Sequence, residues 1–135
     1  GLPMYVFHSD AGVYAKCSFD PMPWLRQFNA LLALLPTDLP NWSHFDADAP
    51  ENPLTPRRPI ASPLFLCGAR NGNQFILMPL ALNGGTSEFT ARMPLTMTIY
   101  ALPACNSIAQ VSVAEGETVR FETAAKACLM VGKTQ

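Results

Sequence analysis

Residues 95–102 read Leu-Thr-Met-Thr-Ile-Tyr-Ala-Leu, and the order of these side chains decides the fold class. Over the first six positions apolar residues alternate with threonine or tyrosine, so an extended strand would carry its apolar side chains on one face. The same period of two recurs at residues 108–114 and 118–123. Such alternation predicts strands with one buried face and one face toward solvent.

Turn signals separate further segments of this kind. Asn71-Gly72 is the strongest short hairpin signal in the chain, and Asn83-Gly84-Gly85 marks another turn. Pro79 favours an edge or a bulge for the strand that contains it. The predicted strands are residues 4–8, 13–19, 64–69, 74–82, 87–92, 95–102, 108–114, 118–123 and 126–131.

One segment has helical spacing instead. Apolar residues from Trp24 to Leu35 recur at intervals of three and four, which predicts an amphipathic helix at about residues 23–35. Pro36 ends this helix, because proline cannot continue it. A widened apolar face indicates that the helix lies across a sheet or is covered on more than one side.

The 135 residues suffice for one domain, residues 1–135, because two cores of half this size would be unstable. Seven to nine short strands with regular turns predict a mainly β fold, an antiparallel sandwich or barrel, with a jelly-roll-like arrangement among the alternatives. A lone helix does not supply the repeating βαβ unit of a parallel sheet. Residues 95–102 are similar to strands of the jelly-roll capsid proteins of small RNA viruses, over eight residues of common strand composition.

Residues 36–63 differ in kind, because they contain seven prolines. No strand or helix of normal length is expected there. We predict an ordered excursion with polyproline character, pinned by Trp42 and Phe45. Connections of this length are often functional, although a linker draped over the core fits equally well.

Charge excludes some partners. Charged residues make up 14% of the chain, and nine basic residues nearly cancel ten acidic ones, so no nucleic-acid partner is expected. The apolar stretches are too short for a membrane span. No secretory leader is recognised. Because the first residue is Gly1, the N-terminus does not indicate the compartment, and a virion, the extracellular space and other locations are all alternatives. A surface poor in charge favours a protein partner, self-assembly or an oligomer.

Few residues of the chain have chemistry suitable for a hydrolytic site. His8 and Ser9 are adjacent and Asp20 follows, which makes these three the weak candidates for a Ser–His–Asp site. Neighbouring residues of a strand point to opposite faces, and no GxSxG elbow surrounds the serine. A strand-end histidine beside a polar turn is the favoured interpretation.

Metal and cofactor sites find little support. His44 lies near Asp46, Asp48 and Glu51, but a solvated acidic loop is favoured over a calcium site because the full ligand series is missing. No phosphate or dinucleotide motif occurs, so neither a metal nor a cofactor is expected. The four cysteines are Cys17, Cys67, Cys105 and Cys128. Their spacing in the sequence is too long for a zinc site, and buried thiols are favoured over disulfides.

By elimination, a non-enzymatic structural or binding module that acts through its surface loops is favoured. Trp42, Phe45, Arg57 and Arg58 are the candidate binding residues, since paired arginines suit an acidic partner. Low charge and many proline, methionine and threonine residues fit a subunit or projecting domain of a virus or phage particle. The alternatives are a small hydrolase using His8 and Ser9 with an aspartate, and a secreted adhesive domain with disulfides.

Overall fold

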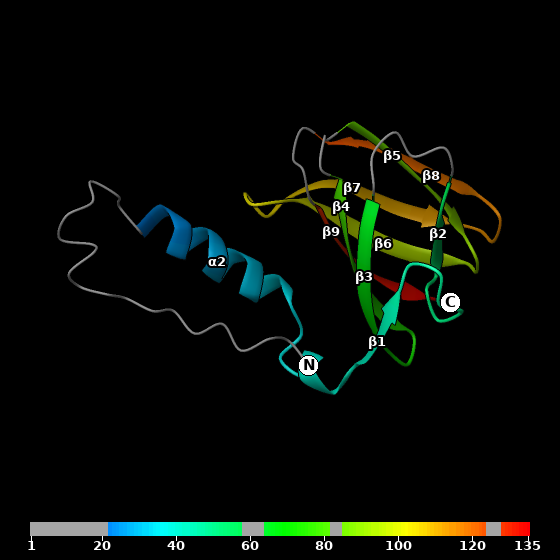
Figure 1. Ribbon diagram of the computed structural model, residues 1–135, viewed down its shortest axis with the longest axis horizontal. Coiled ribbons are helices and arrows are strands. Elements are labelled where there is room, and N and C mark those ends of the chain that lie inside the picture. The colour runs from blue at the N-terminus through cyan, green and yellow to red at the C-terminus, as the bar shows by residue number, and fades with distance from the viewer. Residues whose placement is uncertain (1–21, 58–63, 82–84, 124–127) are drawn as a thin grey trace.

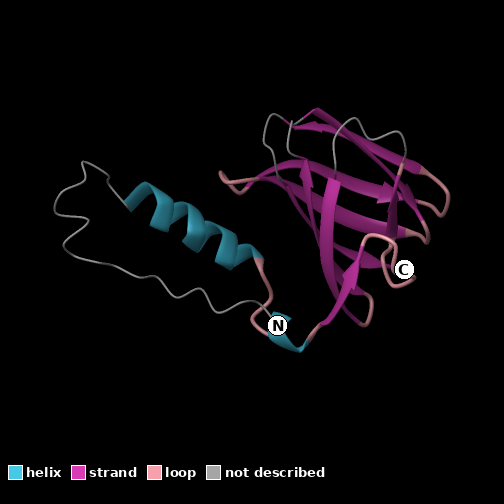
Figure 2. Ribbon diagram, in the orientation of Figure 1, coloured by secondary structure: helices cyan, strands magenta, loops and turns pink. Residues whose placement is uncertain are grey.

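The computed structural model describes residues 22–57, 64–81, 85–123 and 128–135 (Figure 1). The described part is mainly β, with two antiparallel sheets and one α-helix, as predicted. The sheets form two layers, and neither closes on itself, so the fold is a sandwich and not a barrel (Figure 2). The strands predicted at residues 4–8 and 13–19 lie outside the described residues.

The larger sheet has six strands and the smaller sheet has three. The larger sheet runs in the order β1 (Ser43–Asp46), β3 (Leu64–Asn71), β4 (Gln74–Ala81), β9 (Cys128–Thr134), β6 (Leu95–Ala101) and β7 (Asn106–Val113). The smaller sheet runs in the order β2 (Leu54–Pro56), β5 (Gly85–Ala91) and β8 (Thr118–Thr123).

The pairing of the later strands is nested. Strand β4 pairs with β9, β5 with β8 and β6 with β7, so that the chain changes sheet after β4, β5, β7 and β8. Strand β9 also pairs with β6 and thereby joins the outer and inner pairs. This is the strand pairing of a jelly roll, shortened to three pairs.

Strand β6 shows how the sequence alternation becomes a buried core. Its apolar residues point between the sheets and are buried, whereas Thr96 is exposed and Thr98 is half-buried. On β9, Gly132 has no room for a side chain, because a Cβ atom there would lie 2.5 Å from the Thr96 carbonyl oxygen. The buried residues between the sheets are Phe45, Leu54, Phe75, Leu77, Phe89, Ala91, Leu95, Met97, Ile99, Val119, Cys128 and Met130.

The structure describes the proline-rich segment as far as residue 57, and this part contains short elements. A 3-10 helix, η1 (Leu39–Asn41), precedes β1, and β2 adds three residues to the smaller sheet. The fully buried Asn52 holds the loop between β1 and β2, because its Nδ2 donates to the Ala47 carbonyl at 2.9 Å and its Oδ1 accepts from the Leu54 amide at 3.0 Å. Residues 58–63 lie outside the described part.

Helix α2 (Met22–Leu34) projects from the sandwich beside the larger sheet (Figure 1). Leu31 and Leu34 pack against a second apolar cluster on the outer face of that sheet, while Leu32 remains 45% exposed. An apolar cavity of about 320 Å³ lies between the helix and the sheet. The helix therefore covers the sheet incompletely. The prediction that it lies across a sheet holds only for the part that carries Leu31 and Leu34.

The cysteines of the described part are free thiols in three different settings. Cys128 is buried in the core, as its apolar segment predicted. Cys67 is exposed on the outer face of β3, so its prediction as a core residue was wrong: the strand pairing turns it away from the smaller sheet. Burial of part of the thiol, with the carboxylate of Asp46 nearby, still raises the pKa of Cys67.

The buried thiol makes stability depend on alkaline pH. Cys128 is 2% exposed, and burial raises its pKa from 9.0 to about 12. Between these values the unfolded chain has lost this proton and the folded chain keeps it. We therefore expect the free energy of unfolding to fall as pH rises through this window, by at most about 1.4 kcal/mol per pH unit from this group. Urea unfolding at about pH 8 and about pH 10.5 measures the loss. A Cys128→Ala variant should lose less, and an equal loss in both proteins would contradict the assignment.

Candidate functional site

The outer face of the larger sheet divides into two halves of different chemistry. Over β3, β4 and the start of β9 it is apolar, and Ala69, Ile76 and Leu129 are buried there beneath Leu39 and Trp42. Over β7, the end of β9 and the Thr96–Thr98 part of β6, most outward side chains are polar. Tyr100 of β6 and Val131 of β9 still pack against the apolar cluster.

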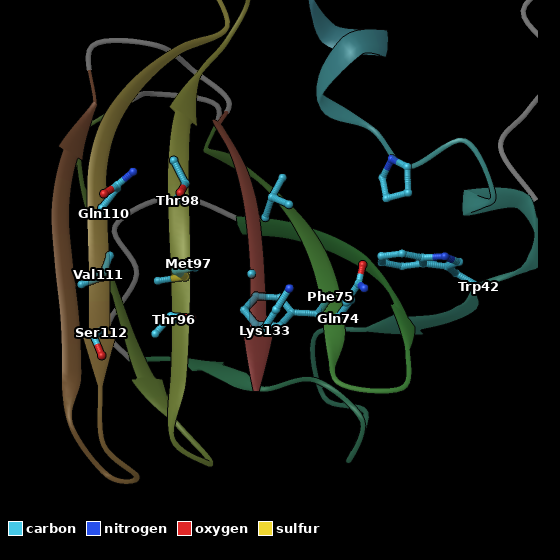
Figure 3. A pocket seen from close by; sticks show the side chains of 13 residues that line it. Trp42, Gln74, Phe75, Thr96, Met97, Thr98, Gln110, Val111, Ser112 and Lys133 are labelled. Carbon is cyan, nitrogen blue, oxygen red and sulfur yellow. The ribbon is translucent and has the colours of Figure 1, made fainter. Parts of the chain in front are cut away.

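The polar half forms a shallow groove with a volume of about 510 Å³. Figure 3 shows Thr96 and Thr98 on β6 beside Gln110 and Ser112 on β7. All four occupy the outward positions of strands whose alternate residues point into the core. The remaining lining residues are Pro36, Trp42, Gln74, Phe75, Met97, Val111, Val131, Gly132 and Lys133.

Strand register arranges these side chains in two rows across the sheet. In the first row Thr96 lies opposite Ser112 on one side and Lys133 on the other. In the second row Thr98 lies opposite Gln110 and Val131. Side chains directly opposite each other on neighbouring strands have Cβ atoms roughly 5 Å apart, so the hydroxyl and amide groups form a compact polar array.

Trp42 stands at one end of the groove, beyond Gln74 (Figure 3). The indole is only 5% exposed, and its Nε1 has no hydrogen-bond partner among the described residues. An unpaired buried N–H costs about 1–3 kcal/mol. The aromatic ring therefore stabilises the fold by packing with Leu39 and its neighbours, at a cost in unsatisfied polarity.

The array suits hydrogen bonding to an uncharged ligand. Hydroxyl and amide side chains both donate and accept, whereas Lys133 is the only residue with a charge among the described residues that line the groove.

The candidate binding residues that the structure describes are separated in space. Trp42 reaches the groove, whereas Phe45 is buried in the core between the sheets. Arg57 is exposed on the smaller sheet, where its Nη1 donates to Thr118 Oγ1 at 3.3 Å. The other four candidates, Arg58, His8, Ser9 and Asp20, lie outside the described residues, so the hydrolase site stays a prediction.

The four central groove residues were not identified as binding residues from the sequence. Their positions on the polar faces of β6 and β7 were visible as alternation. The sequence does not give the strand order. The two rows of side chains form only because β6 pairs with both β7 and β9.

Two further properties concern the acidic loop and membranes. Among the described residues no group of three or more His, Cys, Asp or Glu side chains could hold a metal ion. His44 and Asp46 are both exposed on β1, and they do not belong to such a group among the described residues. In the same part of the chain, no helix has the length and apolar character to cross a membrane.

Comparison with known protein families finds no family that matches this chain, and comparison with curated proteins finds no similar sequence.

The unpaired indole gives a stability test. A Trp42→Phe change removes the buried N–H while keeping an aromatic ring, so we expect a free energy of unfolding within about 1 kcal/mol of the parent value, or above it. A Trp42→Ala change should lower it by about 3–5 kcal/mol, because most of the packing is lost. Urea unfolding followed by circular dichroism measures both. Equal losses for phenylalanine and alanine would show that the N–H has a partner.

Proposed function

We propose that this chain is a non-enzymatic binding module whose polar groove contacts a neutral, hydroxyl-rich ligand of the oligosaccharide class. The observation that carries the proposal is the pair of uncharged polar rows, Thr96 with Ser112 and Thr98 with Gln110. This assigns to a sheet face the binding role that the sequence had suggested for loops.

The chemistry of the rows matches that of sugars. Each sugar hydroxyl can donate and accept a hydrogen bond, and so can the threonine, serine and glutamine side chains. Outward residues are spaced by about 7 Å along a strand and by about 5 Å between strands. Polar groups spread over this area fit linked sugar rings better than one ring.

The scaffold favours binding because the side chains are held in place before the ligand arrives. Thr96 and Thr98 belong to β6, which pairs on both sides, with β9 and with β7. Side chains on a paired strand lose less freedom on binding than side chains on a loop. The groove lies on the solvent side of the sheet, so ligand binding leaves the core between the sheets unchanged.

A charged ligand is disfavoured. Among the described lining residues only Lys133 is charged, and it lies at one end of the Thr96 row. One lysine is a small footprint for nucleic acid, which is normally bound through several phosphate contacts. Binding to a neutral sugar should therefore change little with salt concentration.

The groove is tested with an array of neutral and acidic oligosaccharides, followed by calorimetric titration of the neutral glycan with the strongest signal. We expect Thr98→Val and Gln110→Ala to weaken its binding about fivefold or more, since each removes hydrogen-bonding groups from a formed contact. Thr118→Val, an equivalent change on the exposed side of the smaller sheet, is the control and should bind as the parent does. An array without neutral-glycan binding, or equal weakening by the control, would overturn the proposal.

A second candidate is a structural subunit or projecting domain of a virus or phage particle. The nested pairing of β4–β9, β5–β8 and β6–β7 supports it, because jelly rolls are common in viral capsids and in lectins. The low charge content is compatible with burial in an assembly. Electron microscopy of the concentrated protein tests this candidate: regular particles are expected, and only dispersed molecules would count against it.

A further inference from the structure

The two sheets of the described part have four edge strands, and three of them carry features that hinder pairing with another strand. Strand β1 has four residues and contains Asp46. Strand β2 has three residues and ends at Pro56. Strand β8 carries Arg120, whose guanidinium forms an ion pair with Glu88 on β5. Short length, proline and charge are the common means by which edges avoid association.

The fourth edge, β7, has no such protection in its composition. Its sequence from Asn106 to Val113 contains neither a charged residue nor a proline over eight residues. All eight are at least partly exposed, and Ile108 is 39% exposed. Strand β7 pairs with β6 alone, and within the described part no strand pairs with its other side, although β8 lies near it.

A register shift limits the usable length of this edge. Ala109 lies opposite Ile99 and Ser107 lies opposite Tyr100, so that Ile108 is an extra residue in β7. From Ala109 to Val113 the pairing with β6 is regular. This five-residue stretch, with Gln110 and Ser112 outward, is a regularly paired and neutral template for a further strand.

We propose that β7 is an interface between two copies of this chain, with the two β7 strands paired antiparallel about a twofold axis at Val111, the centre of the regular stretch. A second copy suits this edge because a neutral strand meets an identical neutral strand without like-charge repulsion. A twofold axis also presents the same patch from both copies and closes the assembly at two. The larger sheets of the two copies then form one continuous sheet.

The pairing has consequences on both faces of the joined sheet. On the outer face, Gln110 and Ser112 of both copies lie side by side, so the two polar grooves become continuous across the axis. On the inner face, Ala109, Val111 and Val113 are half-buried against the core in a single copy, and the neighbouring strand covers them further. The interface therefore buries apolar surface in addition to satisfying the free backbone groups of the edge.

Charge substitution beside the axis tests the interface. Sedimentation of the parent protein should show a mass that rises with concentration from 14.7 kDa toward twice that value. Gln110→Lys alone and Gln110→Glu alone should each weaken dimerisation about tenfold or more, because like charges then lie close together on the same face, on either side of the axis. An equimolar mixture of the two variants should restore association through opposite charges.

The control is Ser43→Lys, which adds the same positive charge to the opposite edge of the same sheet and should dimerise as the parent does. Circular dichroism checks that each variant is folded, and hydrogen exchange should show protection of β7 amides that increases with protein concentration. A parent protein that stays monomeric at millimolar concentration, or a mixture that fails to restore association, would overturn the interface. Glycan binding measured at a concentration where the protein is monomeric reports on the proposed function independently of this result.

Discussion

Contact between the inner faces of two sheets holds this molecule together. Phe75, Leu95 and Ile99 of the larger sheet share one apolar cluster with Phe89 and Val119 of the smaller sheet, and all five are buried. Full burial of a side chain of this size stabilises a fold by about 1.5–3 kcal/mol. The nested strand pairs keep the two layers in register, because the chain passes between them after β4, β5, β7 and β8.

This packing decides which surfaces remain for recognition. Since the inner faces are used by the core, the chemistry open to partners lies on the outer faces, the loops and the strand edges. The segment from α2 to β1 covers the apolar half of the larger sheet with Leu39 and Trp42, in a cluster that extends to Tyr100 at the end of β6. The polar rows of Thr96 and Thr98 are left open as a result, and the groove depends on where that cover ends.

Low charge gives the surface a consistent character. In the groove, the groups offered to the proposed ligand are mainly hydroxyls and amides, and Lys133 is the only charged residue among the described lining residues. On β7 the same property leaves an edge without electrostatic protection against another strand. Groove and edge meet at Gln110 and Ser112: the proposed ligand would contact the side chains of these residues, and the proposed partner strand would pair with the backbone of β7.

The sequence by itself determined the secondary structure of most of the second half and the side of β6 that is buried, because alternation of apolar side chains is a local property. Helix α2 was also predicted, since the spacing from Trp24 to Leu35 and the proline after it are local signals. The short strands β1 and β2 were not predicted, because the proline-rich segment is held by distant partners such as β3 and β5. Only the tertiary structure decided that Cys67 faces outward, that Trp42 borders a groove, and that β7 is an edge. These properties depend on which strands become neighbours, and strand order is set by packing over the whole chain.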